Sequence, residues 1–171
     1  MRGHPMTHTP VRFFSPAWRG LLAALGLWLT LLSPPASAQL CTVVGVAPLF
    51  GTYSTSIGAP ANGSVTVTCV VLGILGQDVS YTVKLGMSPQ AQGTQRRMNN
   101  GSAFLNYNVF CDAGFNQVWG NGVSPTCAPT GGQAGLLGNL VTVFPVYGNI
   151  PAGQYVTPGT YGDNIAIDVL Y

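Results

Sequence analysis

The stretch that decides the fold is PGTYGDNIAIDVLY, residues Pro158 to Tyr171, at the C-terminal end of the sequence. From position 165 onward, every second residue is large and apolar: Ile165, Ile167, Val169 and Tyr171. An alternation of period two predicts a strand with one buried face. The sequence offers no further strand to lie beside this one, so we expect one of its edges to be unpaired. An unpaired edge is a place where another chain can add a strand.

Upstream, several short stretches have the composition or alternation of strands, with Gly-rich and Pro-rich turns between them. They are Thr42 to Tyr53, broken near Gly45 and Pro48, then Val65 to Val71, Val79 to Leu85, Leu105 to Val109, and Val141 to Tyr147. Pro145 restricts the last of these to a sheet edge or a bulge. Met87 to Gly101 has the polar composition of turns, and Cys111 to Gly138 that of a long loop. No segment keeps a helical period, so the sequence predicts an all-β sandwich of six or so strands.

The first 38 residues have the pattern of a secretory signal peptide. Three arginines precede Leu21 to Leu32, an apolar run shorter than the roughly 20 residues that span a bilayer as a helix. Ala36-Ser37-Ala38 then supplies a small-x-small cleavage site. We therefore expect residues 1–38 to be the leader and residues 39–171 to be the single mature domain, with Met1 or Met6 as the initiator.

Composition excludes several classes of function. Residues 39–171 contain no Glu and no His, and their three basic residues face four aspartates, for a net charge of −1. Three scattered basic residues cannot neutralise a phosphate backbone, so we expect no nucleic-acid partner. Without His, neither a Ser-His nor a Cys-His nucleophilic pair can be built. Asp163 and Asp168 have opposite parity and cannot act as a carboxylate pair. We therefore expect no enzymatic activity and no small-molecule substrate.

All four cysteines lie beyond the predicted leader: Cys41, Cys69, Cys111 and Cys127. They lack the paired short spacing of a zinc site, and no phosphate-binding Gly-rich loop is present, so we expect neither a metal nor a cofactor. Behind a signal peptide, an even count predicts two disulfides. Three pairings are open, and we favour Cys41 with Cys69 and Cys111 with Cys127. Each bridge would contribute about 3 to 4 kcal/mol by restricting the unfolded chain.

Two apolar stretches offer an alternative function. Val70 to Gly76 is apolar with turn glycines, and Ala134 to Leu140 is similar. The first stretch either folds over the end of the core or forms an exposed contact patch. In the second case the protein would be a self-contained secreted β-sandwich binding module that contacts a ligand or surface through apolar loops.

Several short motifs follow one another between Cys41 and Tyr171. They are Cys41-Thr42-Val43, Phe50-Gly51-Thr52-Tyr53, Gly63 to Cys69, Arg97-Met98, Leu105 to Phe110 with Asp112, Trp119-Gly120, Val146-Tyr147-Gly148, Ile150-Pro151, Gly153-Gln154, and Pro158 to Asp163 with the final alternating strand. In the order and spacing of these motifs, Cys41 to Tyr171 resembles the spore coat protein U family, the archaic, Csu-type chaperone-usher pilin subunits.

The resemblance implies an incomplete immunoglobulin-like sandwich that lacks its final strand and is completed by a donor strand from a partner. A periplasmic chaperone would first fill the groove beside Ile165, Ile167, Val169 and Tyr171. A neighbouring pilin or coat subunit would replace it during export through an outer-membrane usher. The product would be a secreted structural or adhesive subunit on the cell surface, in a fimbrium or coat, and the carboxylate of Tyr171 would bind basic residues of the chaperone.

Four residues ahead of the last strand have expected structural roles: Tyr161, Asp163, Arg97 and Trp119. Tyr161 is either a tyrosine corner or a plain core tyrosine. Arg97 is either a solvated loop charge or the partner of Asp112 or Asp163, and Trp119 is the single Trp beyond the leader. Polymerising family members carry a donor segment ahead of the first cysteine. Cleavage after Ala38 leaves two residues there, so we expect a subunit that accepts a strand without donating one, at a fibre tip or in a coat.

Overall fold

The computed structural model describes residues 39–71 and 76–171, which lie in one unit of the chain, Ser37–Tyr171. The predicted signal peptide, residues 1–38, lies outside the described residues. The described part contains no helix, and therefore none long and apolar enough to cross a membrane. Its strands are β1 (Gln39–Val46), β2 (Ala59–Val71), β3 (Gln77–Leu85), β4 (Arg96–Asn99), β5 (Phe104–Phe110), β6 (Thr130–Leu136), β7 (Gly138–Ile150) and β8 (Ile167–Leu170).

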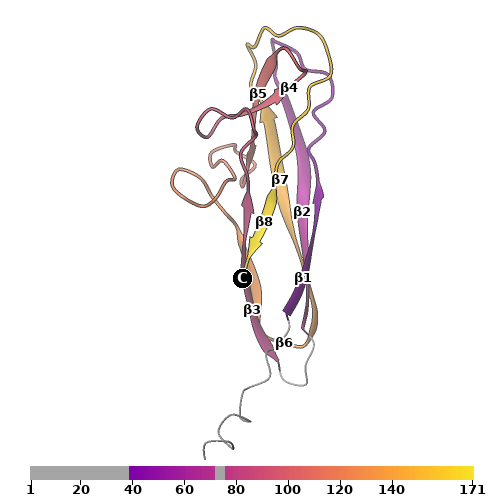
Figure 1. The fold of residues 1–171 in the computed structure, drawn as a ribbon, viewed down its shortest axis with the longest axis vertical. Coiled ribbons are helices and arrows are strands. Elements are labelled where there is room, and N and C mark those ends of the chain that lie inside the picture. Colours follow the sequence, from indigo (N-terminus) through magenta and orange to yellow (C-terminus); the bar gives the residue numbers. More distant parts are fainter. Residues whose placement is uncertain (1–38, 72–75) are drawn as a thin grey trace, which may run out of the picture. The chain divides into compact units, whose positions relative to one another are not determined.

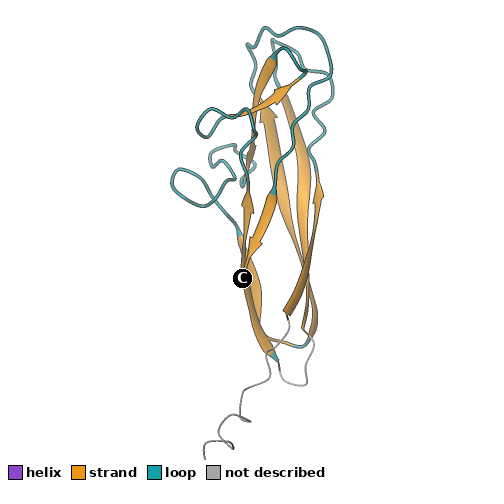
Figure 2. Ribbon diagram, viewed as in Figure 1, coloured by secondary structure: helices purple, strands orange, loops and turns teal. Residues whose placement is uncertain are grey.

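The strands form two antiparallel sheets packed face to face (Figures 1 and 2). The larger sheet has the order β1-β2-β7-β5-β4, and the smaller has the order β6-β3-β8. The longest pairing joins β2 to β7, from Ala59 opposite Ile150 to Val71 opposite Gly138. The prediction of an all-β sandwich is therefore confirmed.

The core lies between the sheets because each main strand has one apolar face. In β2 and β3 every second side chain is buried: Val65, Val67, Cys69 and Val71, then Val79, Tyr81, Val83 and Leu85. Trp119 is fully buried, its ring packs edge-on against Phe144 with centroids 6.3 Å apart, and its Nε1–H donates to the Val83 carbonyl at 3.0 Å. Burial of each such apolar side chain contributes roughly 1.5 to 3 kcal/mol.

The two disulfides have the pairing favoured from the sequence. Cys41 on β1 lies directly opposite Cys69 on β2 and is bonded to it. Cys111, just after β5, is bonded to Cys127 in the loop that carries Trp119. The first bridge joins the edge strand β1 to the centre of its sheet, and the second holds the long loop against the sandwich.

Two strands were missed by the sequence prediction because their composition is not typical of strands. β4 lies within Met87 to Gly101, where polar residues indicated turns, and its buried positions are Arg96 and Met98. β6 lies within Cys111 to Gly138, where the glycines of TGGQAGL indicated a loop. Glycine weakens a strand, but pairing with β3 supplies the backbone hydrogen bonds of β6.

The final strand is shorter than the pattern predicts, since β8 begins at Ile167 and ends at Leu170. The preceding residues are nevertheless extended, because Gly162 bridges to Asn99 of β4 and the Ala166 carbonyl accepts from Gly86. Pro145 lies on the part of β7 that pairs with β2 alone, since pairing with β5 begins at Tyr147, which agrees with the edge position predicted for it.

Candidate functional site

The strongest candidate site is the free edge of β8. In the described residues β8 has one hydrogen-bonded neighbour, β3, in register pairs from Thr82 opposite Leu170 to Leu85 opposite Ile167. In the other direction β8 faces β1, the edge strand of the larger sheet, without pairing to it. The sandwich therefore has two strand edges facing each other, and one of them belongs to the C-terminal strand (Figure 1).

The hydrogen-bond phase shows which backbone groups of β8 are unpaired. Gly86 N–H donates to the Ala166 carbonyl at 2.9 Å. Because hydrogen-bonded pairs alternate along an antiparallel ladder, Asp168 and Leu170 also make their backbone hydrogen bonds to β3. The N–H and C=O groups of Ile167 and Val169 consequently point away from β3, toward the free edge. These are the groups that an added strand would use.

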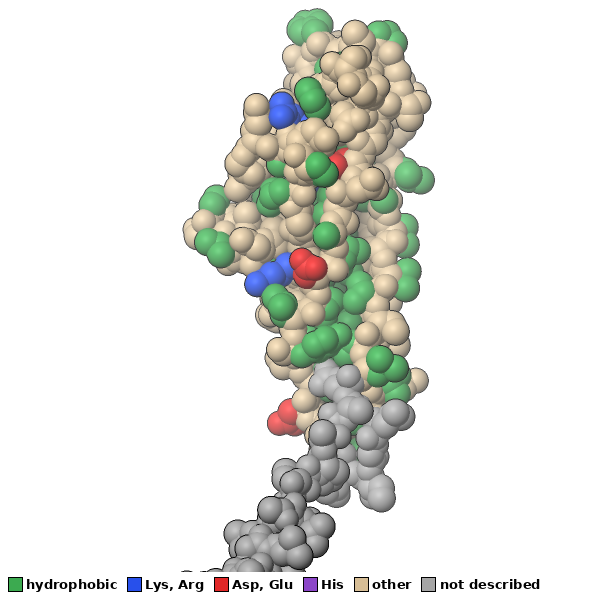
Figure 3. All heavy atoms as spheres, viewed as in Figure 1, with side chains coloured by type: hydrophobic (Ala, Val, Ile, Leu, Met, Phe, Trp, Pro, Cys, Tyr) green, Lys and Arg blue, Asp and Glu red, His purple; other side chains and the backbone are tan. Residues whose placement is uncertain are grey.

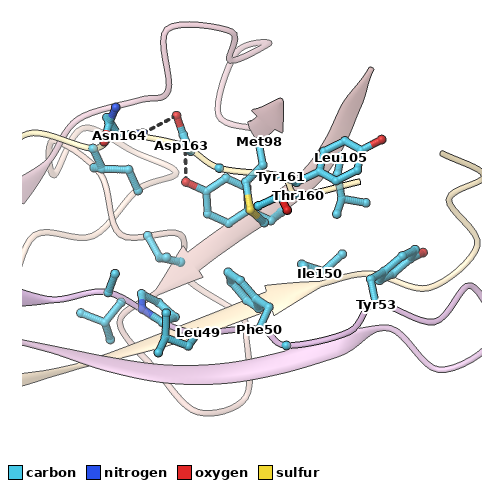
Figure 4. Close-up of a pocket in the computed structure, with 18 of the residues that line it drawn as sticks. Leu49, Phe50, Tyr53, Met98, Leu105, Ile150, Thr160, Tyr161, Asp163 and Asn164 are labelled. Atoms are coloured by element: carbon cyan, nitrogen blue, oxygen red, sulfur yellow. Dashed lines mark hydrogen bonds between the residues drawn. The ribbon is translucent and has the colours of Figure 1, made fainter. Parts of the chain in front are cut away.

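A cavity of about 1080 Å³ opens beside this edge. One wall is Val46 to Tyr53, the chain that follows β1, and the other is Val156 to Ile165 with Ile167. The floor is largely apolar side chains of the core: Leu85, Met98, Leu105, Val109, Val146 and Ile150. In Figure 4 Phe50 and Tyr53 lie across the cavity from Met98, Tyr161 and Asp163. Figure 3 shows hydrophobic side chains gathered in the lower centre of this face, with basic and acidic side chains beside them.

One end of the groove is closed by a close approach of β1 to β8. Gly45 lies opposite Ile167, and a Cβ at Gly45 would be 2.6 Å from Ile167 Cδ1. A side chain at position 45 would therefore force the end of the Ile167 side chain to move. At the other end, two tyrosine hydroxyls hydrogen-bond to the backbone. Tyr53 donates to the Pro151 carbonyl at 3.0 Å, and Tyr161 donates to the Thr157 carbonyl at 2.7 Å. The Tyr161 bond to a carbonyl four residues upstream is the bond that defines a tyrosine corner.

The groove contains one polar pair. The Tyr107 hydroxyl donates to Asp163 Oδ2 at 2.5 Å, and Asp163 Oδ1 accepts from the backbone N–H of Asn164 at 2.8 Å. Burial, followed by the hydrogen bond to Asp163, raises the pKa of Tyr107 well above its usual value. The tyrosine therefore stays neutral and acts as a donor, and Asp163 is the charged acceptor in the lining of the groove.

Arg96 lies beneath this pair and was not identified from the sequence. It is fully buried, and its Nη2 donates to the Gly86 and Trp119 carbonyls at 2.6 and 2.7 Å, with a longer contact of 3.3 Å to Leu85. Burial lowers the pKa of Arg96, while the nearby Tyr107 and Asp163 oppose that shift. The Arg96 charge is therefore held near the polar pair by carbonyls from two parts of the chain.

Three of the four residues predicted to face the groove share one face. Ile165, Ile167 and Val169 are half-buried and pack against the core, and Ile165 and Ile167 line the cavity. Tyr171, expected on the same face, is 67 % exposed and does not line the cavity. The alternation thus continues to Val169 and ends where β8 ends.

The prediction for Arg97 was wrong in both of its forms. Its Nε donates to the Gln90 carbonyl at 2.5 Å, and its guanidinium lies 4.6 Å from the centroid of the Phe104 ring. Asp163 pairs with Tyr107 instead, and the Asp112 carboxylate accepts from backbone N–H groups of its own loop, which lowers the pKa of Asp112. The adjacent Arg96, which is indistinguishable from Arg97 by composition, is the buried one.

The second of the two apolar stretches differs from the loop expected of a binding module, whereas the first is described only at its ends. Most of Val70 to Gly76 lies outside the described residues. Ala134 to Leu140 is the end of β6, the start of β7 and a tight turn between them, in which Leu136 is buried and Leu137 is exposed. No group of three or more His, Cys, Asp or Glu placed to hold a metal occurs in the described part of the chain.

Comparisons with known proteins agree with this geometry. The family model of the Spore Coat Protein U domain matches residues 27–168. Protein U of Myxococcus xanthus is 33% identical over 135 residues, which cover 71% of this chain and 70% of that protein.

A solved structure has the same fold. It is the CsuC–CsuE chaperone–tip adhesion subunit pre-assembly complex from archaic chaperone-usher Csu pili of Acinetobacter baumannii, with a TM-score of 0.52 and 20% identity. The match covers 78% of this chain and 40% of that chain. This likeness identifies the sandwich as an incomplete immunoglobulin-like fold, in which β8 has a neighbour on one side. Together with the family match, which covers most of the sequence, it shows that this chain belongs to the spore coat protein U domain family.

Proposed function

We propose that the protein is a structural or adhesive subunit of a bacterial surface fibre or coat, and that its groove is filled by a β-strand from a partner. One observation carries the proposal: the unpaired backbone groups of Ile167 border a cavity with an apolar floor, and those of Val169 continue the same free strand edge. A strand added there would form main-chain hydrogen bonds to β8 and place alternate side chains in the cavity. This is a binding function without catalysis.

The energy of such binding is comparable with the stability of a whole domain. Four or five apolar side chains, each contributing about 1.5 to 3 kcal/mol on burial, amount to on the order of 10 kcal/mol. The total stability of a domain is about 5 to 15 kcal/mol. An unfilled subunit should therefore be marginally stable and prone to aggregate.

The partners follow from this need for protection and from the relatives. The solved relative is a complex between a chaperone and a tip adhesion subunit of a chaperone-usher pilus. By analogy, a periplasmic chaperone fills the groove first, an outer-membrane usher exports the subunit, and a strand of another pilin or coat subunit replaces the chaperone. The signal peptide at residues 1–38 directs the chain to the periplasm, and the final location is the cell surface.

The place of the subunit in the assembly is part of the same proposal. Gln39 and Leu40 are the first residues of β1, opposite Val71 and Val70 of β2. If the leader is cut after Ala38, the residues ahead of Cys41 are occupied within the subunit's own sheet. The subunit then accepts a strand without donating one, as a fibre tip or a coat component would.

Periplasmic co-expression with the cognate chaperone tests the proposal. We expect a soluble one-to-one complex and its loss on deletion of Ile165 to Tyr171. A matched control is Asp112→Asn, which changes a charge in a loop remote from the cavity lining and should leave the complex intact. A stable, soluble, monomeric subunit produced without any chaperone would argue against the proposal.

A further inference from the structure

The groove contains one feature that an apolar strand would not satisfy. Asp163 has the same parity as the inward-facing residues of the last segment, Tyr161, Ile165, Ile167 and Val169. All five are half-buried, and Asp163 is the one among them that carries a charge. A carboxylate thus occupies a position that the alternation assigns to an apolar side chain.

The hydrogen bonds of Asp163 leave part of its carboxylate unused. A carboxylate has about four acceptor positions. The structure fills two of them, one with the Tyr107 hydroxyl and one with the Asn164 N–H. In the empty groove, water can reach the other positions, because Asp163 lines both the main cavity and a smaller polar one beside it.

The neighbouring cation does not satisfy these remaining positions. The hydrogen bonds of the Arg96 side chain go to backbone carbonyls, and its Nη1 has no partner among the described residues. Arg96 therefore supplies positive charge near Asp163, without a hydrogen bond to it. When a strand fills the groove and expels water, the open acceptor positions need a donor from the strand itself, because a buried unsatisfied carboxylate is costly.

We propose that Asp163 is a specificity-determining residue of the groove, and that the partner strand presents a hydrogen-bond-donating side chain, such as Ser, Thr or Lys, at the position that faces it. This inference rests on the proposed function and deepens it: the occupant is an apolar strand with one polar interruption. The interruption fixes the register, because a shift of the strand by two residues would place an apolar side chain against the carboxylate.

A strand fused to the protein tests this proposal without knowledge of the natural partner. The full chain is extended after Tyr171 by a Gly/Ser linker of about ten residues and a host strand of about ten residues that alternates Val and Thr. The linker allows the strand to enter in either direction. Leu, Ser, Lys or Glu is then placed at each inward position in turn, and the melting temperature is measured for every version.

At one inward position we expect Lys or Ser to raise the melting temperature above that of Leu by about 4 °C or more, whereas Leu is best at the others. Asp163→Asn should remove the advantage of Lys at that position. The matched control, Asp168→Asn, changes an exposed carboxylate of β8 and should leave every preference unchanged. The Leu, Ser, Lys and Glu strands are compared within wild type, within Asp163→Asn and within Asp168→Asn. This comparison separates the interaction with Asp163 from any effect of the variant on folding.

The outcomes separate the two proposals. If strands stabilise the protein but Leu is best at every inward position, or if the Lys advantage survives Asp163→Asn, the inference about Asp163 is wrong and strand addition stands. If no fused strand raises the melting temperature in any version, the proposed function fails, and this inference fails with it.

Discussion

Replacement of Arg96 by methionine should destabilise the protein by about 3 kcal/mol. Methionine keeps an unbranched apolar stem and removes the guanidinium group, with its charge and its donors. The Gly86 and Trp119 carbonyls, which accept from Arg96 at 2.6 and 2.7 Å, would lose those bonds. Each buried polar group left unsatisfied costs about 1 to 3 kcal/mol, and part of this is offset because a buried cation no longer has to be desolvated.

The assay is urea denaturation followed by the fluorescence of Trp119, in the chain extended by the apolar host strand. Arg96→Lys keeps a charge but loses the fork of donors, and should fall between wild type and Arg96→Met. The matched control is Arg97→Met on the same strand, which loses one bond to the Gln90 carbonyl and a contact with Phe104, for a cost of about 1 kcal/mol. Equal costs for Arg96→Met and Arg97→Met would refute the role assigned to Arg96.

Two further predictions concern the walls of the groove. Because the pKa of Tyr107 is raised in the folded state, its contribution to stability is present below the unfolded value of about 10 and is lost as pH rises above it. Tyr107→Phe should therefore flatten the fall in stability above pH 10 in alkaline denaturation, and an unchanged slope would contradict the assignment. A Cβ at Gly148 would lie 2.7 Å from Phe50 Cζ, so Gly148→Ala should cost about 1 to 3 kcal/mol in urea denaturation. The added variant Phe50→Leu should recover part of that cost, and no recovery would show that the clash lies elsewhere.

Period-two alternation was sufficient to predict the strands that carry the core. It placed Val65 to Val71 and Val79 to Leu85 correctly, because a half-buried strand must alternate. It also placed Ile165, Ile167 and Val169 on one face beside an unpaired edge. The sequence left three pairings of the cysteines open, and the favoured one, Cys41 with Cys69 and Cys111 with Cys127, is the one in the structure.

The parts that the sequence did not reveal depend on contacts between distant segments. The buried Arg96 side chain donates to the carbonyls of Gly86 and Trp119, which are distant in the sequence. No pattern in the neighbouring sequence distinguishes Arg96 from Arg97. The bond from Tyr107 to Asp163 joins residues 56 positions apart. The close approach of Gly45 to Ile167 depends on the packing of two sheets. β6 was not predicted because a glycine-rich strand has the same composition as a glycine-rich loop.

The central claim, that a partner strand pairs with the free edge of β8, is tested most directly by amide hydrogen exchange in the four residues of that strand. The amides of Asp168 and Leu170 bond to β3, whereas those of Ile167 and Val169 point to the groove. We predict that Asp168 and Leu170 are protected both before and after a partner strand is bound, and that Ile167 and Val169 become protected only when it is bound. Protection of Ile167 and Val169 in the unfilled protein, or rapid exchange of both in the complex, would contradict the account.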